Sequence, residues 1–443
     1  MAVLPSPGSE RWPSTASKQH ASKRGGADRA GATARGARSA STSFSSLVKG
    51  LLNTPLASFY LVLVSSGLLI GLGVMMVLSA SSVYAYMNLN GDSYYFVKRQ
   101  SVFLVAGVIA AFVLARARLR TLRLLAWIGL GVAFVLLILT YTPLGVTVNG
   151  NANWVRLGSS YLQLQPSEFA KLAMIMWGAD VLARKKKLLD QPRHLLVPFL
   201  PASMLLVLLV VFQGDMGTAV IMMGIIGGIL WIIGTPMRLL GLMFALVVTA
   251  VAALTITQPS RMRRFLGFLN PTDGIDGVNM QATVGQYALA TGGWWGVGLG
   301  ASRQKWGSLP EAHTDYIFAV IGEELGLFGA LTVLALFLIL GYAGIRIALR
   351  SDHLFYRIAA SGVTIWFLFQ GLVNLCVVLR LLPVLGVPLP MLSYGGSALL
   401  ANLLALGVLI NCARNEPEAR QLLAARRRRP QPKMTTVVGS RRG

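Results

Sequence analysis

Residues 238–257 read RLLGLMFALVVTAVAALTIT, and after Arg238 they contain no charged side chain. About 20 consecutive apolar residues in an α-helix span the roughly 30 Å hydrocarbon core of a bilayer. This run therefore predicts a transmembrane helix. The whole chain of 443 residues has the same character, with 54% hydrophobic and 13% charged residues, whereas soluble domains have roughly 25% charged residues. The composition excludes an ordinary soluble enzyme.

Runs of similar length and hydrophobicity recur along the chain. They lie near 57–82, 101–115, 124–143, 167–183, 195–212, 216–234, 238–257, 316–345, 357–379 and 391–412. By the length criterion they predict about ten transmembrane helices. The sequence thus predicts an all-α polytopic membrane protein.

The basic residues are unevenly distributed over the connections between these runs. Of the 40 Lys and Arg residues, 30 fall in the two tails and in alternate connections, together with 7 of the 16 acids. That side carries about +23 of the net charge of +24, and the other side about +1. The positive-inside rule then predicts that both termini are cytoplasmic. The basic excess orients the chain and meets anionic membrane lipid or cytoplasmic partners, so no nucleic-acid binding is expected.

The chain divides into a transmembrane domain, 56–413, and two basic cytoplasmic tails, 1–55 and 414–443. The first tail is rich in Ala, Ser, Gly and Arg and is expected to be disordered. Because this tail is long and polar, we expect the first span to be a retained anchor and not a cleaved signal peptide. Cys376 and Cys412 lie in or beside apolar runs and are predicted to be core residues.

Two outer loops, about 144–166 and 258–315, are too long to be simple connections. The second is a long extracellular loop between the seventh and eighth predicted helices. It contains the apolar stretch Trp294-Trp295-Gly296-Val297-Gly298-Leu299, which predicts a segment that lies along or dips into the outer membrane interface.

The richest cluster of ionisable residues ends this loop where the eighth helix must begin. It reads Leu309-Pro310-Glu311-Ala312-His313-Thr314-Asp315-Tyr316. Asp315 is either an N-cap of the helix or a general base, and its position alone does not separate the two. Glu311 and His313 favour the general base, because such neighbours tune a carboxylate. Glu323 and Glu324, two turns into the helix, are expected to bond neighbouring helices or a helix end.

Basic residues flank the same loop. Arg261, Arg263 and Arg264 open it, and Arg303 and Lys305 precede its end. They either anchor to lipid headgroups or bind a substrate that carries a diphosphate.

The first outer loop and the next connection contain further candidates. Trp154 is either an interfacial anchor or a substrate contact. Lys171, one turn into a membrane helix, needs a partner, and Glu168 at position i−3 is available. Asp215 is either a helix cap or a partner for an outer Arg or Lys. Near the last helix, the glycines after Ser393 either pack against neighbours or expose amides to a phosphate.

Taken in order, these segments resemble the SEDS family of peptidoglycan polymerases over residues 57 to 413. The resemblance rests on the following segments: Asn149-Gly150 with Trp154; Gln165-Pro166-Ser167-Glu168 with Lys171; Asp215 with Gly217-Thr218; Arg261, Arg264, Pro271 and Asp273; Gly292 with Gly298-Leu299-Gly300; Leu309 to Asp315 with Ile321-Gly322-Glu323-Glu324-Leu325-Gly326; and Ser393-Tyr394-Gly395-Gly396-Ser397.

The forms Gly298 to Lys305 and Glu311 to Asp315 look like the cell-division branch more than the elongation branch. The long basic tails suggest an actinobacterial member. The chain departs from the family pattern at Asn153, where an Arg is frequent, at Gly214, where Pro is usual, at Ser308, where an aromatic is usual, and at Tyr316, where Phe is usual.

The resemblance implies polymerisation of lipid II on the outer face of the bacterial plasma membrane, at the division septum, with Asp315 as the catalytic base. We expect substrate binding by the outer side chains Trp154, Arg156, Glu168, Lys171, Asp215, Arg261, Arg264, Lys305, Glu311, His313 and Ser393. The resemblance leaves the cofactor open between none and a divalent cation, Mg²⁺ or Mn²⁺. The expected partners are a class B penicillin-binding protein of the FtsI type and other divisome proteins.

Three alternatives stay open. The first is a transporter that flips a lipid-linked precursor, although the chain has no convincing internal repeat and its ionisable residues concentrate in outer loops. The second is a polymerase of the elongation branch. The third is a division scaffold whose tails recruit cytoplasmic partners.

Overall fold

The computed structural model divides at Ala57 and Ser58 into two units, and the fold described below belongs to the second, Ser58–Gly443. The structure describes residues 50, 54–89, 91–148, 151–156, 158, 163–188, 191, 196–269, 280–306 and 309–428. Most of the first predicted tail, the second tail from residue 429 on, and the motif residues Asn149, Gly150, Pro271, Asp273 and Ser308 lie outside the described residues.

Each of the ten predicted spans coincides with a helix. These are α2 (Ala57–Asn88), α3 (Tyr95–Arg116), α4 (Leu119–Leu139), α5 (Pro166–Arg184), α7 (Phe199–Phe212), α8 (Met216–Ile233), α9 (Met237–Thr257), α12 (Ile317–Arg350), α13 (Leu354–Val378) and α14 (Gly396–Arg414). Eight of them are long and apolar enough to cross a membrane. The other two are α5, which carries Glu168, Lys171, Asp180 and Arg184, and α7, which is about 21 Å long. The predicted helical membrane fold is confirmed.

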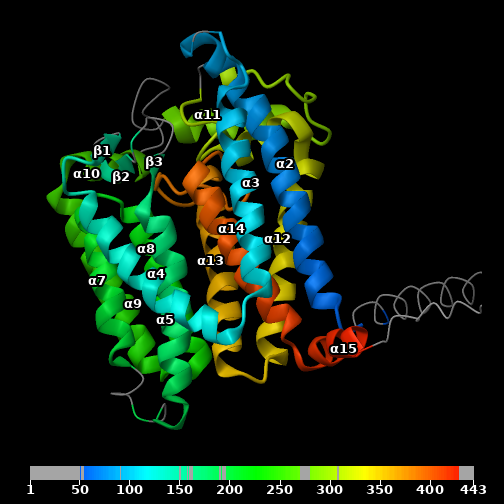
Figure 1. Ribbon diagram of the computed structural model, residues 1–443. Coiled ribbons are helices and arrows are strands. Elements are labelled where there is room, and N and C mark those ends of the chain that lie inside the picture. The colour runs from blue at the N-terminus through cyan, green and yellow to red at the C-terminus, as the bar shows by residue number, and fades with distance from the viewer. Residues whose placement is uncertain are drawn as a thin grey trace, which may run out of the picture. The chain divides into compact units, whose positions relative to one another are not determined.

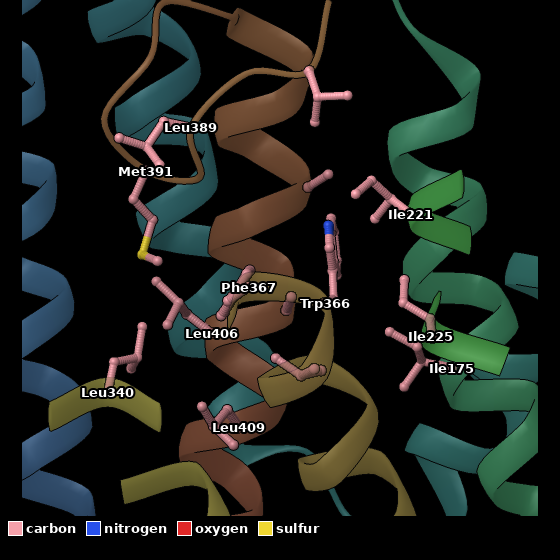
Figure 2. Close-up of a cluster of buried hydrophobic side chains, with 14 of the residues drawn as sticks. Ile175, Ile221, Ile225, Leu340, Trp366, Phe367, Leu389, Met391, Leu406 and Leu409 are labelled. Atoms are coloured by element: carbon pink, nitrogen blue, oxygen red, sulfur yellow. The ribbon is translucent and has the colours of Figure 1, made fainter. Parts of the chain in front are cut away.

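Helix α13 lies at the centre of the bundle, because it packs against α5, α8, α12, α14 and also α11 (Met280–Gly292). Figure 1 shows α4, α5, α7, α8 and α9 on one side of it and α2, α3, α12 and α14 on the other. Its buried face carries Trp366 and Phe367, at 0% and 1% exposure. Figure 2 shows these two rings in one cluster with Ile221 of α8, Leu406 of α14 and Met391 of the loop before α14. That loop, residues 379–395, therefore enters the core.

The first long outer loop forms a small antiparallel sheet, which the sequence analysis did not predict. Its strands are β1 (Gly145–Val148), β2 (Asn151–Arg156) and β3 (Gln163–Leu164), in the order β1-β2-β3. The pairing register shifts between Val146 and Val148 of β1, opposite Trp154 and Asn151 of β2. The second long loop contains α10 (Pro259–Leu269), which packs on α9, and α11 (Met280–Gly292), which packs on α12. Both loops lie at the same end of the bundle, which we call the outer end (Figure 1).

Helix α12 breaks at Gly326, whose φ of +68° and ψ of −165° are accessible essentially only to glycine. The break leaves backbone groups at 323–328 without their partners in the helix, and the segment 293–298 forms hydrogen bonds with them. The amides of Val297 and Gly298 donate to the carbonyls of Glu323 and Glu324, and two amides after the break donate back to residues 293 and 294. Irregular backbone inside a membrane requires such internal partners. Trp295 of this segment is 82% exposed, and its placement at the membrane interface stays a prediction.

The opposite, inner end carries different chemistry. The buried carboxylate of Asp180 pairs with Arg123 of α4 and Arg184 of α5, at 3.2 and 2.8 Å, and also accepts from the Trp127 indole. The predicted second tail includes a helix, α15 (Pro417–Arg428), which packs on α14. Among the free cysteines, Cys412 is buried as predicted and Cys376 is half-buried.

Candidate active site

Asp315 lies at the outer end, in the tight turn that leads into α12. The turn is closed by the amides of Thr314 and Tyr316, which both donate to the carbonyl of Glu311, at 3.1 and 3.2 Å. Glu311 itself has a φ of +56°, which non-glycine residues rarely adopt. The Asp315 carboxylate faces Gly386, where an added Cβ would lie 3.6 Å from Oδ2. The turn before α12 and the loop before α14 therefore meet at this carboxylate.

The Asp315 carboxylate does not cap α12, which was the alternative to a general base considered from the sequence. The N-cap of α12 is Tyr316, not Asp315, and no side chain caps the helix. Within the described residues, no hydrogen bond or ion pair holds the Asp315 carboxylate. Burial, the largest cause, and the negative charges of Glu311 and Asp215 together raise its pKa to about 7. A carboxyl group with this pKa is suited to accept a proton near neutral pH.

Asp215 is a helix cap. Its Oδ1 accepts from the amide of Thr218 at 2.9 Å, which caps α8, and its Oδ2 accepts from the Thr218 hydroxyl at 2.8 Å. The side-chain amides of Asn153 and Gln165 also donate to Oδ2, at 3.3 and 3.1 Å. The cap therefore joins α8 to β2 and to the start of α5. Asp215 is 7% exposed, so its charge acts on the site mainly through its field.

Two departures from the family pattern meet beside this cap. Asn153 is the donor to Asp215, and Gly214 has a φ of +91°, which proline cannot adopt. A Cβ at Gly214 would lie 2.5 Å from Oδ1 of Asn151. The glycine and the asparagine residues of β2 therefore form one local arrangement. A third departure, Tyr316, is fully buried, and its hydroxyl has no partner among the described residues.

Lys171 and Glu168 form a fully buried ion pair on α5, as the i, i+3 spacing predicted. Lys171 Nζ donates to Glu168 Oε1 at 2.7 Å and to Gln370 Oε1 at 2.8 Å, and it lies 4.8 Å from the Trp366 ring centre. Both ionic side chains are 1% exposed. Their charges are thus satisfied inside the bundle, and direct contact with substrate stays a prediction.

Lys305 also has partners inside the protein, in a network of hydrogen bonds and an ion pair. Its Nζ donates to the carbonyl of Gly300 at 2.6 Å and lies 3.4 Å from Glu324 Oε1. Glu324 also accepts from Ser79 of α2, and Glu323 accepts from the amide of Arg303. The two glutamates therefore bond a neighbouring helix and the outer loop, as expected from the sequence. Substrate binding by Lys305 stays a prediction.

His313 and Ser393 serve the packing of the outer end. The imidazole of His313 lies among the rings of Tyr84, Phe96 and Tyr394, with centroids 5.8, 4.7 and 5.5 Å away. Burial among them lowers its pKa, against the opposing charge of Glu311. Ser393 Oγ accepts from the amide of Leu389 at 2.8 Å and holds the turn before α14. The structure places the two residues beside the loops that form the site, and substrate binding by either stays a prediction.

Trp154 and Arg156 lie on β2, where Trp154 pairs with Val146 and Arg156 pairs with Gln163. Arg156 is exposed and borders a shallow surface pocket with Pro143 and Gly145. Binding of substrate by either residue stays a prediction.

Arg261 and Arg264 lie one turn apart on α10, and no carboxylate among the described residues pairs with them. Arg261 Nη2 donates to the carbonyl of Gly214, next to Asp215, at 3.2 Å. Burial lowers the pKa of Arg261, and the neighbouring charge of Arg264 lowers it too. Two like charges at i, i+3 repel each other, so the pair is suited to an anion that neutralises both.

Three polar residues on α13 or just after it were not predicted from the sequence. Gln370 and Asn374 on α13 are both 1% exposed, and Arg380 follows this helix with a φ of +57°. Nη2 of Arg380 is buried without a partner among the described residues. The signal for the two amides was available, because polar residues spaced i, i+4 inside the apolar run 357–379 need buried partners.

A metal site is not preformed in the described part of the chain. No three His, Cys, Asp or Glu side chains lie there close enough to hold a metal ion. Asp315, Glu311 and Asp215 interact through their charges but do not form such a set. A role for Mg²⁺ or Mn²⁺ stays a prediction, and no step below depends on it.

Comparison with known proteins shows which family the chain belongs to. The sequence model of the cell cycle protein family of FtsW, RodA and SpoVE matches residues 59–418. The chain belongs to this family. Among the relatives of the FtsW/RodA/SpoVE family, a probable peptidoglycan glycosyltransferase FtsW of Mycobacterium tuberculosis is 38% identical over 85% of this chain and 71% of its own length. The stage V sporulation protein E of Bacillus subtilis is 38% identical over 78% of this chain and 94% of its own.

Solved structures of the FtsW/RodA/SpoVE family have the same fold. One comes from a peptidoglycan synthase complex that coordinates polymerization and crosslinking. It has a TM-score of 0.61 at 29% identity and covers 78% of this chain and 98% of its own. The rod shape determining protein RodA of Thermus thermophilus has a TM-score of 0.58 at 27% identity and covers 80% of this chain and 96% of its own. The protein is therefore a multi-pass membrane protein, as predicted.

The ion pair of Lys171 and Glu168 gives a test of its internal role. We expect Lys171→Met to destabilise the protein by about 3–5 kcal/mol, because it leaves the Glu168 carboxylate buried without its cation. Adding Glu168→Gln recovers most of this loss. Thermal unfolding in detergent micelles measures both effects.

The matched control is Lys98→Met, which breaks the exposed pair of Lys98 and Asp92 and leaves the unfolding temperature nearly unchanged. If Lys171→Met unfolded at the temperature of the unmodified protein, the buried pair would have no structural role.

Proposed function

We propose that the chain polymerises lipid II into glycan strands on the outer face of the plasma membrane, with Asp315 as the general base. The observation that carries the proposal is the Asp315 carboxylate, which has no partner among the described residues, has a pKa near 7 and lies where two outer loops meet. The family supports the reaction class, because relatives that cover most of this chain are named peptidoglycan glycosyltransferases.

The proposed step is one displacement. The ionised Asp315 carboxylate removes the proton from the 4-hydroxyl of the acceptor GlcNAc, and that oxygen attacks the anomeric carbon of the donor MurNAc. The bond from this carbon to the diphosphate oxygen breaks, and the electron pair leaves with undecaprenyl diphosphate. The new glycosidic bond has the inverted configuration. Asp315 ends protonated and returns its proton to water.

The leaving diphosphate needs cations that are not already neutralised. Lys171 and Lys305 each have an internal carboxylate partner, at 2.7 and 3.4 Å. Arg261 and Arg264 have none among the described residues, and Arg261 contacts the carbonyl next to Asp215. We therefore assign diphosphate binding to Arg261 and Arg264, whose guanidinium groups form forked hydrogen bonds with phosphate oxygens.

The cellular role follows from the family. We propose that the chain acts at the division septum with a class B penicillin-binding protein of the FtsI type and other divisome proteins. Two observations support this: relatives at 36–40% identity carry the name FtsW, and a structural neighbour comes from a synthase complex that couples polymerization to crosslinking.

The decisive variant is Asp315→Asn, which keeps the shape of the side chain but cannot accept a proton. We expect polymerisation to fall by about 10²- to 10⁴-fold. The assay follows glycan chains formed from lipid II by the full-length chain purified with its class B partner. The control Asp92→Asn removes an exposed outer carboxylate and keeps full activity. Full polymerisation by Asp315→Asn, at equal expression, would remove Asp315 from the reaction.

Substitutions on α10 test the assignment of diphosphate binding to Arg261 and Arg264. We expect Arg261→Ala and Arg264→Ala each to raise the KM for lipid II by about tenfold or more, because each loses a charge-assisted hydrogen bond. Arg263→Ala is the control, since Arg263 is exposed on a different face of α10 and should change KM by less than about twofold. Equal effects of all three substitutions would indicate a general charge effect and contradict the assignment.

A further inference from the structure

Two buried amides on α13 lie between the ion pair of α5 and the Asp315 turn. Gln370 and Asn374 are one helical turn apart, and each is 1% exposed in a helix that is otherwise mostly apolar. Neither belongs to the ionisable residues that the mechanism uses. A buried carboxamide is costly unless its donors and acceptor are bonded, so the partners of these two side chains define what they hold.

Asn374 bonds two backbone carbonyls from different loops. Its Nδ2 donates to the carbonyl of Asp315 at 2.8 Å and to the carbonyl of Val387 at 2.8 Å. Asp315 is 59 residues away in sequence and Val387 is 13 away. One side chain thus fixes the separation between the turn before α12 and the loop before α14, the two segments that meet at the Asp315 carboxylate.

Gln370 connects the same loop to the buried ion pair. Its Nε2 donates to the carbonyl of Pro388 at 2.8 Å, next to the carbonyl that Asn374 holds. Its Oε1 accepts from Lys171 Nζ at 2.8 Å and from Trp366 Nε1 at 2.7 Å. The hydrogen bonds run from Glu168 through Lys171 and Gln370 to the backbone at 387–388, and from there through Asn374 to Asp315.

The loop is held from its other side as well. Gly217 in the first turn of α8, two residues after Asp215, packs so closely on the carbonyl of Leu385 that a Cβ has no room. Gly386, which faces the Asp315 carboxylate, has a φ of +68°. The segment 385–388 is therefore clamped between α8 and α13, and its position determines what lies opposite Asp315.

We propose that Gln370 and Asn374 are positioning residues of the glycosyltransfer reaction, because they fix the Asp315 turn against the 385–388 segment and anchor both to the Lys171 and Glu168 pair. The inference rests on the proposed function of Asp315. It assigns no contact with substrate to either amide. Their loss therefore impairs the geometry of proton transfer more than the binding of lipid II.

The chain provides a matched control for Asn374. Asn411 on α14 is also 1% exposed, and its Nδ2 also donates to two carbonyls, those of Leu114 and Ala117, at 2.7 and 2.8 Å. These carbonyls end α3, at the inner end of the bundle. Asn411→Leu therefore removes an equivalent structural clamp away from the Asp315 turn.

The experiment compares Asn374→Leu with Asn411→Leu in the full-length chain purified with its class B partner. It measures thermal unfolding, and kcat and KM for lipid II. We expect similar losses of thermal stability, because each leaves two buried carbonyls without donors. Asn374→Leu should lower kcat by about tenfold or more with KM within about threefold, whereas Asn411→Leu should keep kcat within about twofold.

A second variant keeps the test decisive if Asn374→Leu does not fold. Gln370→Glu retains an oxygen that accepts from Lys171 and Trp366 and removes the donor to Pro388, and we expect the same loss of kcat. Equal kcat for the α13 variants and Asn411→Leu would overturn the inference while Asp315→Asn remained inactive. Full activity of Asp315→Asn would instead overturn the proposed function itself.

Discussion

A lysine ammonium buried inside a membrane protein must find all its partners within the bundle, and Lys171 is such a group. Its three hydrogen-bond donors cannot reach water at 1% exposure, so Glu168 and Gln370 must stay in place around it. Gln370 in turn must accept from Lys171 with one end, which directs its amide nitrogen toward Pro388. A single charge requirement on α5 therefore fixes α13 and the loop before α14.

The requirement that a buried charge has a partner sets Asp315 apart from the other buried carboxylates. Three other buried carboxylates have assigned partners: Asp215 caps α8, Glu324 meets Lys305, and Asp180 meets two arginines. Asp315 lies between rigid, satisfied elements, yet its carboxylate has no partner among the described residues. Leaving one carboxyl group in negative surroundings costs stability, and strained or unsatisfied groups of this kind are typical of reactive sites.

The sequence predicted the parts of the fold that depend on local properties. Long apolar runs gave the helices, because a spanning helix needs only its own length and hydrophobicity. The pairing of Lys171 with Glu168 was predictable because the residues are three apart on one helix. The three-stranded sheet was missed because its strands are short, although Val146 and Val148 alternate with Thr147 ahead of Asn149-Gly150, a pattern typical of a hairpin. Contacts between distant segments were not accessible: Gln370 is 199 residues from Lys171, and Asn374 is 59 from Asp315. Residues so far apart in sequence come into contact only when α13 packs against its neighbours.

The central claim is that Asp315 is the base, and the pH dependence of kcat for lipid II polymerisation tests it most directly. The reaction needs the ionised carboxylate, so a raised pKa means that activity is lost as the pH falls through about 7 and is full above it. Measured with the full-length chain and its class B partner between about pH 5 and 9, the rate should rise through one midpoint near 7. A rate that stayed constant down to about pH 5, as an ordinary aspartate with a pKa of about 3.9 would give, would contradict the account.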